Sequence, residues 1–179
     1  MTTLFNKEGF TFTKMERNYY KLLFKIENPN IILSKIIDFN LVKLIYDLNP
    51  DIYEKTNLNI IDENEAIIQL LMKHLFEDLG FPQKYSHLHI TKDESETCVR
   101  FTSVPIKERP EGIPDDAESM QVKSLICFCD ILTPHKVLFS CDVRFDDNAN
   151  IPPIGDKIIG LILYKIFTRM KQFIENVKM

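Results

Sequence analysis

Two short motifs carry side chains that bind metal ions in other proteins. His87 and His89 are separated by one residue, and so are Cys127 and Cys129. In a β-strand, residues i and i+2 point to the same face, so each motif presents two ligands together. A structural zinc site needs four such ligands. The two strands would therefore have to lie side by side to form a site, and we expect neither a metal ion nor a cofactor.

A third thiol, Cys141, follows in the next apolar stretch. The runs on either side of the Thr-Pro-His-Lys turn alternate with period two, which predicts a β-hairpin. A two-residue loop pairs Thr133 with Lys136 and places Cys141 on the opposite face from Cys127 and Cys129. We therefore predict that the thiols fill strand positions as small hydrophobic residues. A slip of one residue in the register would reverse the faces of one strand and overturn this assignment.

The sequence contains no catalytic or nucleotide-binding motif that we recognise. It lacks Gly-x-Ser-x-Gly, a Walker A loop, Gly-x-Gly-x-x-Gly and His-Glu-x-x-His. The chain has only five glycines in 179 residues, which disfavours loops that cradle phosphates. We therefore expect a protein that is not an enzyme.

The charge and composition limit the classes of partner. The chain has 22 basic and 26 acidic residues, and the net charge of −4 disfavours nucleic-acid binding. The bias toward lysine, isoleucine and asparagine is typical of an AT-rich genome, as in some protists and large DNA viruses. No apolar run reaches the roughly 20 residues that cross a bilayer, and the first residues lack a secretory pattern. We expect an intracellular protein, cytoplasmic or nuclear, that is neither secreted nor inserted into a membrane.

Hydrophobic periodicity predicts a single α+β domain over the whole chain. Residues 1–27 form a hairpin-like segment, although a helix also fits part of this stretch. Residues 28–80 are predicted to be helical, and residues 84–146 are predicted to form antiparallel strands. Residues 156–178 carry the broad apolar stripe of a long helix.

The clearest helix of the first half is predicted over residues 63–79. Asp62 and Glu65 have the spacing of a capping box, and Gly80 stands where a helix often ends. The architecture that follows has two layers. An antiparallel sheet of four to six strands packs against the long C-terminal helix and the shorter middle helices.

These features favour a non-enzymatic protein-interaction or assembly module. The chain has more apolar surface than one small sheet and one helix would bury, which is typical of a protein that docks on a partner or a second copy of itself. The residues expected at the contact are Phe10, Phe12, Tyr19, Tyr20, Leu125, Ile131 and Leu138.

Two alternatives remain open. A curved sheet followed by a long helix is similar in element order to the helix-grip lipid and sterol binders, which implies a hydrophobic-ligand carrier. The helix expected over 63–79 and the phenylalanines and leucines that face the C-terminal helix argue against a carrier. A sheet backed by a long helix also resembles TATA-binding folds and implies a transcription component, but the acidic charge weighs against it.

Overall fold

The computed structural model describes residues 1–178, which form ten strands, two α-helices and two short 3-10 helices. The strands are β1 (Thr2–Lys7), β2 (Phe10–Glu16), β3 (Tyr19–Glu27), β4 (Tyr53–Asp62), β5 (Glu65–Met72), β6 (Lys84–Glu94), β7 (Cys98–Pro105), β8 (Glu118–Ser119), β9 (Val122–Thr133) and β10 (Lys136–Phe145). The helices are η1 (Leu33–Ile36), α1 (Phe39–Asp47), η2 (Glu77–Leu79) and α2 (Pro153–Glu175).

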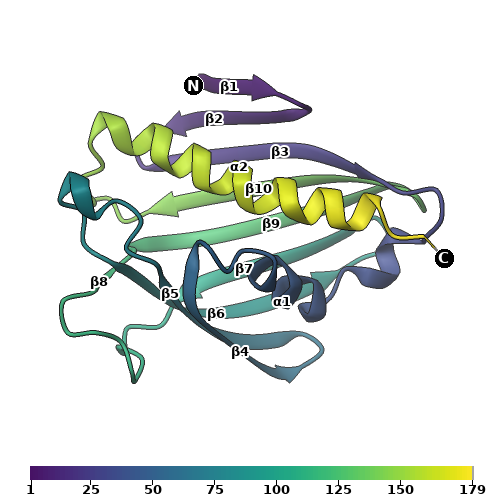
Figure 1. Cartoon of the computed structure of the whole chain (residues 1–179). Coiled ribbons are helices and arrows are strands. Elements are labelled where there is room, and N and C mark those ends of the chain that lie inside the picture. Colours follow the sequence, from purple (N-terminus) through teal and green to yellow (C-terminus); the bar gives the residue numbers. More distant parts are fainter. Residues whose placement is uncertain (179) are drawn as a thin grey trace.

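All ten strands belong to one curved sheet. Their order is β1-β2-β3-β10-β9-β7-β6-β5-β4, and the short strand β8 lies beside β6. Apart from the parallel β6–β8 pair, the pairings are antiparallel. Helices α1 and α2 cover the same face of the sheet, which we call the inner face (Figure 1). The predicted α+β architecture with two layers is therefore confirmed, with more strands than the four to six expected.

The helix predicted over residues 63–79 is wrong, and the segment forms strand β5 followed by a loop. Asp62 does not cap a helix; its carboxylate accepts the backbone N–H of Asn64 in the turn between β4 and β5. Asx turns and helix caps use the same short-range hydrogen bond, so the sequence alone does not separate them. Gly80 ends only the 3-10 helix η2, with φ of +77°.

The helical prediction over residues 28–80 also missed strand β4. This edge strand, read as a polar connection, is exposed at nearly every position because no further strand covers it. An edge strand with polar side chains on both sides lacks the alternation that marks a half-buried strand. The remaining helical part is short and comprises η1 and α1, whose first turn is capped by the side chain of Asp38.

The register of the β9–β10 hairpin differs from the prediction by one residue. Thr133 pairs with Lys136 as expected, but the next pair is Ile131 with Val137, because an irregularity at this point skips one residue. A β-bulge inserts one unpaired residue and shifts every later pair. Cys141 therefore lies directly opposite Cys127 on the inner face, and the predicted separation of the thiols is wrong.

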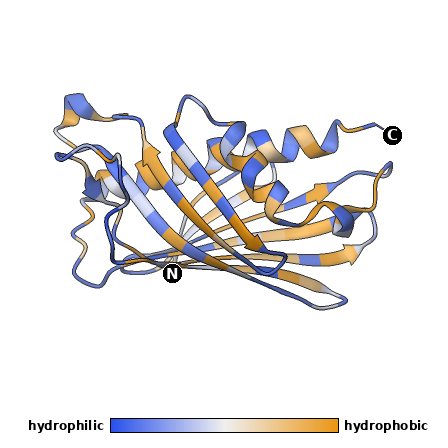
Figure 2. Cartoon of the chain, turned by 90° about the horizontal axis from the view of Figure 1, so that it is seen from below, coloured by the Kyte–Doolittle hydropathy of each residue, from blue (hydrophilic) through white to orange (hydrophobic). Residues whose placement is uncertain are grey.

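Alternation along the strands divides the sheet into a buried and a solvated face. The odd-numbered residues of β10 from Val137 to Phe145 point inward and are buried, whereas their neighbours are only partly covered. Hydrophobic residues concentrate in the strands and helices, and the connecting loops are mostly hydrophilic (Figure 2). The core thus lies between the inner face and the two α-helices.

Candidate ligand-binding cavity

One half of the inner face is filled by stacked aromatic rings. Under α2, the ring of Phe24 lies 4.5 Å from that of Phe10 and 4.8 Å from that of Phe139, measured between ring centroids. Phe167 of α2 closes the stack at 5.1 Å from Phe139. We call this region, the inner face of β2, β3 and β10, the filled half. Its close aromatic packing leaves no space for a ligand.

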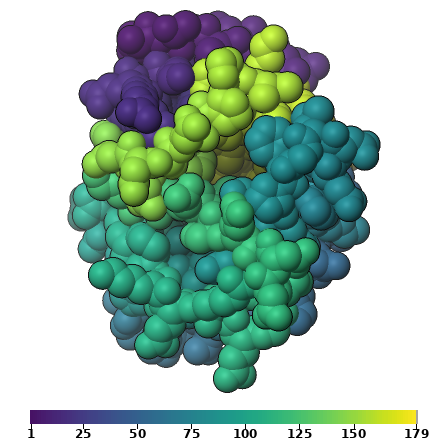
Figure 3. Space-filling view, turned by 90° about the vertical axis from the view of Figure 1, so that its left-hand side faces the viewer, coloured from purple at the N-terminus to yellow at the C-terminus, as the bar shows by residue number. Residues whose placement is uncertain are grey.

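We call the inner face of β9, β7, β6, β5 and β4 the open half, because a cavity lies at one end of it. Away from that end its side chains are buried, as Ile68, Val99 and Phe101 are. A cavity of about 220 Å³ opens where α2 begins. Figure 3 shows this face of the molecule hollowed between the start of α2, the segment that follows β5, and the loops before β9 and after β10. The apolar side chains of its lining include Met72, Leu75, Phe76, Phe81, Met120, Ile158, Ile159 and Ile162.

A second groove of about 580 Å³ lies between α1 and the C-terminal end of α2. Buried Leu41 and Ile174 close its floor, and Ile32 and Phe173 on its rim are 41% and 47% exposed. Three of its side chains, Ile36, Leu41 and Ile174, also line a void of about 10 Å³ against the sheet, which is too small for a ligand. The cavity at the start of α2 is lined by more apolar side chains, and we take it as the candidate for enclosing an apolar ligand.

Two tyrosines meet between α1 and β4 in the open half, outside the lining of the cavity. Tyr46 of α1 and Tyr53 of β4 make an edge-to-face contact with ring centroids 5.0 Å apart. Burial raises the pKa of both phenols far above the ordinary value of 10, and for Tyr46 the neighbouring Tyr53, Cys127 and Cys141 add to the rise. Both hydroxyls therefore remain uncharged donors and acceptors.

Buried polar contacts fix the start of α2 on the filled half. The hydroxyl of Tyr20, which is fully buried, donates to the carboxylate of Asp156 in the first turn of α2. Lys14 of β2 binds the same carboxylate at 3.1 Å. Burial, followed by the hydrogen bond to Asp156, raises the pKa of Tyr20 and keeps it protonated. An acidic residue in the first turn also suits the positive end of the helix dipole.

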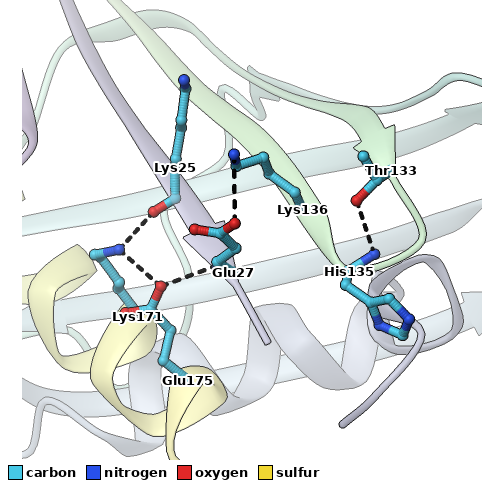
Figure 4. A network of polar contacts seen from close by, with 7 residues as sticks. All are labelled: Lys25, Glu27, Thr133, His135, Lys136, Lys171 and Glu175. Atoms are coloured by element: carbon cyan, nitrogen blue, oxygen red, sulfur yellow. Dashed lines mark hydrogen bonds and ion pairs between the residues drawn. The ribbon is translucent and has the colours of Figure 1, made fainter. Parts of the chain in front are cut away.

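Hydrogen bonds also hold the end of α2 on the filled half. Figure 4 shows Lys171 and Glu175 beside the last residues of β3. The Lys171 ammonium donates to the carbonyl oxygen of Lys25 at 2.7 Å, and the Glu175 carboxylate accepts the backbone N–H of Glu27 at 2.9 Å. Buried Asn28 donates to the carbonyl oxygens at the end of the helix. Helix α2 is thus anchored along the filled half at both of its ends.

Exposed ion pairs hold the middle of α2 toward the open half. Arg169 and Lys165 both contact the carboxylate of Asp51, in the loop between α1 and β4. The hydrogen bonds to Arg169 and Lys165 lower the pKa of Asp51 far below its usual range. Because these side chains are between one third and one half exposed, water and salt weaken the pairs.

The metal-ligand candidates do not come together. His87 and His89 lie on the outer face of β6, where they bond the carbonyl oxygen of Glu108 and the carboxylate of Glu65. Cys127 and Cys129 lie on the inner face of β9, with β7 between the two strands. Across residues 1–178, no three His, Cys, Asp or Glu side chains are placed to hold an ion together.

The thiols instead lie in the apolar floor beneath the helices. Cys129 and Cys141 are 1% and 0% exposed. Burial raises the pKa of Cys129, and the hydrogen bond that the Cys141 thiol donates to Cys127, together with burial, raises that of Cys141. Thiols with raised pKa values react slowly, so these residues serve as small apolar side chains.

Three of the expected partner-contact residues lie inside the core of this chain. Phe10, Phe12 and Tyr20 are 2%, 0% and 0% exposed and pack beneath α2. The sequence predicted more apolar surface than the fold would bury, but ten strands and two helices bury these rings. They therefore offer no surface to another protein.

The other four expected contact residues are split between the two faces of the sheet. Leu125 and Ile131 are partly exposed on the inner face, because the bulge turns β9 over relative to the prediction. Tyr19 and Leu138 are partly exposed on the outer face, where the guanidinium of Arg144 lies 3.6 Å from the centre of the Tyr19 ring. The structure does not combine these residues into one contact surface.

Sequence reasoning missed the residues around the cavity. The segment after β5 was assigned to a helix, so Leu75, Phe76 and Phe81 were placed in a helical stripe or a loop. Phe81 and Pro82 directly after Gly80 are the features that mark a turn and an apolar loop there. None of the helices in residues 1–178 is long and apolar enough to span a membrane.

Comparisons with known proteins identify the fold. No family model and no curated protein matches this sequence. The human StarD13 lipid transfer and protein localization domain is similar in structure, with a TM-score of 0.72 and 14% identity over 98% of this chain and 89% of that one. Human STARD10 is similar with a TM-score of 0.70 and 9% identity over 96% and 71%. A StAR-related lipid transfer protein from Xanthomonas axonopodis is similar with a TM-score of 0.59 and 8% identity over 93% and 99%.

The chain therefore has the helix-grip fold of the StAR-related lipid transfer domains. This finding overturns the prediction of a protein-interaction or assembly module with a protein partner. Three of the structural neighbours are named for lipid transfer, and none of these likenesses supports a protein-interaction module or a viral source. The argument from sequence against a helix-grip carrier rested partly on a helix over residues 63–79, which is a strand and a loop.

Proposed function

We propose that this protein is a non-enzymatic carrier of a lipid, held between the open half of the inner face and the helices. The observation that carries this proposal is the apolar cavity that opens at the start of α2. The fold supports it, because similar structures are named as lipid transfer domains. The whole chain of 179 residues acts as one domain in this proposal. The cysteines, which lie on strands and not in a loop-rich scaffold, favour a reducing compartment inside the cell.

The cavity must enlarge to take up a lipid. Its volume of about 220 Å³ is below the roughly 300–1,000 Å³ of pockets that enclose drug-sized ligands. Helix α2 is anchored at both ends, so we assign the movement to residues 73–83, between β5 and β6. This segment holds only one turn of 3-10 helix and contains no buried residue. Segments with few buried contacts open at low free energy.

Exposed apolar side chains surround the opening. Leu75 and Leu79 after β5 are 37% and 55% exposed, and Ile154 and Leu161 of α2 are 47% and 55% exposed. Apolar side chains gathered beside a cavity are typical of a surface that meets an apolar partner. In this proposal they contact the membrane surface while a lipid passes in or out, without any part of the chain spanning it.

A matched pair of tryptophan variants tests the carrier function. Ile162→Trp places a large ring in the cavity, whereas Leu138→Trp adds the same ring to the outer face. We expect the first variant to weaken binding of the uncharged dye Nile red and of lipids from a vesicle extract at least tenfold. The second variant should bind like the unchanged protein. Native mass spectrometry of the protein before and after incubation with the extract identifies the bound mass.

The proposal fails if the unchanged protein takes up neither the dye nor any lipid from the extract. It also fails if the two tryptophan variants bind equally well, because binding would then take place outside the cavity. Thermal unfolding of both variants checks that each is folded at the temperature of the binding measurement.

A further inference from the structure

We propose that Tyr46 and Tyr53 bind the polar end of the ligand, and that this end is an uncharged oxygen, a hydroxyl or a carbonyl. This inference rests on the proposed carrier function and adds the chemical class of the lipid. A sterol, a long-chain alcohol and a neutral acyl ester share this chemistry. A lipid that places an ionised carboxylate or phosphate in the interior does not.

The two hydroxyls have unused hydrogen-bonding capacity inside the protein. Within residues 1–178, neither the hydroxyl of Tyr46 nor that of Tyr53 bonds a protein atom, and neither is among the polar atoms sealed from solvent. Both side chains are partly exposed, yet burial is the largest cause of the raised pKa of each phenol. Each hydroxyl therefore borders interior space. Buried polar groups are normally hydrogen-bonded. Two hydroxyls without hydrogen bonds that face open space therefore favour a ligand oxygen as the missing partner.

The tyrosine pair is connected with the mouth of the cavity. Tyr53 pairs with Met72 across β4 and β5, and Met72 lines the cavity. The next residue, Lys73, donates its backbone N–H to the carbonyl oxygen of Ile52 at 2.7 Å. A ligand that enters past Met72 therefore meets Tyr53 first. Its apolar body then remains against the lining of the cavity.

The side chains that raise the pKa values of the two phenols are the thiols of Cys127 and Cys141 and, for Tyr46, the ring of Tyr53. No lysine or arginine is among them. An ion without a counter-ion is strongly disfavoured at such a place, whereas a hydroxyl or carbonyl needs only one or two hydrogen bonds.

Two lysines, Lys73 and Lys84, line the cavity. Lys73 is exposed, and Lys84 lies 3.2 Å from Glu118. Neither is among the groups that shift the pKa of Tyr46 or Tyr53. The preference for an uncharged oxygen therefore applies at the tyrosine pair, and a charged group would meet the lysines at the mouth of the cavity.

The test removes each hydroxyl and keeps each ring. Tyr46→Phe, Tyr53→Phe and the double variant are compared with Tyr19→Phe, which alters the outer face. Nile red is displaced by 1-hexadecanol or hexadecane, and by cholestanol or cholestane. The members of each pair differ in one hydroxyl. We expect the affinity for the alcohols to fall about three- to tenfold for each hydroxyl removed, with no change for the hydrocarbons or in the Tyr19 variant.

A stability measurement separates ligand binding from a structural role. Removing an unpaired hydroxyl leaves the ligand-free protein equally stable or slightly more stable, because no internal hydrogen bond is lost. The inference is overturned if the alcohols and the hydrocarbons lose affinity equally, or if neither changes. It is also overturned if hexadecanoate binds more tightly than 1-hexadecanol. A protein that binds neither Nile red nor any of these lipids would instead refute the carrier function itself.

Discussion

The two halves of the inner face differ in what fills the space beneath the helices. In the filled half, the rings of Phe10, Phe24 and Phe139 meet the sheet side of α2 with no gap. In the open half, a cavity remains beneath the start of α2, beside Met72, Phe81 and Ile162. One sheet and one helix thus serve two purposes. Large rings supply the packing that stabilises the fold, and the segment after β5 leaves room for a ligand.

This division explains how a small protein tolerates a hollow core. A cavity lowers stability because the side chains around it lose packing contacts. The filled half compensates by burying large aromatic side chains, which contribute the most apolar area per residue. It also holds α2 at both ends, so that movement at the cavity does not release the helix.

The largest expected effect comes from deleting the same side chain in each half. Leu22 is fully buried in the filled half, whereas Leu125 is partly exposed in the open half. We expect Leu22→Ala to lower the free energy of unfolding by about 3–5 kcal/mol. Leu125→Ala should lower it by about 2 kcal/mol or less, because its environment is already loosely packed. Urea denaturation measures both values, and equal losses would remove the distinction between the halves.

The hydrogen bond that anchors the start of α2 should have the next largest effect. Tyr20→Phe removes the donor to Asp156 and leaves Lys14 as the remaining partner. A buried hydrogen bond to a charged group stabilises by about 1.5–3 kcal/mol, so we expect a loss of about 2 kcal/mol. Tyr164→Phe is the control, since its hydroxyl bonds the exposed carboxylate of Glu8. A loss in the control as large as that of Tyr20→Phe would show that burial does not matter here.

Adding one carbon atom tests how tightly the filled half is packed. A Cβ at Gly160 would lie 2.7 Å from two atoms of the Phe12 ring, which is fully buried and cannot turn away freely. Alanine is favoured over glycine in helices by about 1 kcal/mol, but overpacking costs about 1–3 kcal/mol. We expect Gly160→Ala to destabilise the protein by about 1 kcal/mol net in thermal or urea unfolding. A more stable variant would mean that the side chains of the filled half can shift to accommodate the extra carbon atom.

The sequence predicted the elements with strong periodicity, and these form the filled half. The helix predicted over residues 156–178 appears as α2, and the hairpin-like segment predicted over residues 1–27 appears as β1, β2 and β3. Such patterns are reliable because burial of one face dominates their energetics. The aromatic residues near the start of the chain were recognised as apolar but were assigned to a partner, because the number of strands that would cover them was unknown.

The open half was harder to predict because its determinants are local and weak. The apolar run of residues 66–72 fits both a strand, through Ala66, Ile68 and Leu70, and a helix, through Ile67, Ile68 and Leu71. Asp62 is likewise compatible with a turn and with a helix cap. One bulged residue near Thr133 decided the face on which three thiols lie. The cavity residues come from loops, where no period exists, and the tyrosine pair joins α1 to β4 through a contact that spacing does not reveal.

The smallest expected effect on stability concerns the exposed ion pairs that hold α2 on the side of the open half. Asp51→Asn removes the charge that attracts Arg169 and Lys165. Exposed ion pairs stabilise by about 0.2–1 kcal/mol, so we expect a loss of about 0.5 kcal/mol at pH 7. Asp47→Asn, which breaks the surface pair with Lys43, is the control for a charge that does not touch α2.

The pH dependence of the Asp51→Asn variant follows from the lowered pKa of Asp51. In the folded protein this pKa lies below the unfolded value near 3.9, so the carboxylate stabilises the fold above pH 4. That contribution falls as the pH drops below 4 toward the folded-state pKa. The difference in the free energy of unfolding between the unchanged protein and Asp51→Asn should therefore shrink between pH 4 and pH 2.

Because these ion pairs border the open half, Asp51→Asn should also speed the uptake of Nile red, whereas Asp47→Asn should not. A stability difference that stays constant to pH 2, or equal uptake rates, would show that the helix is held on the filled half alone.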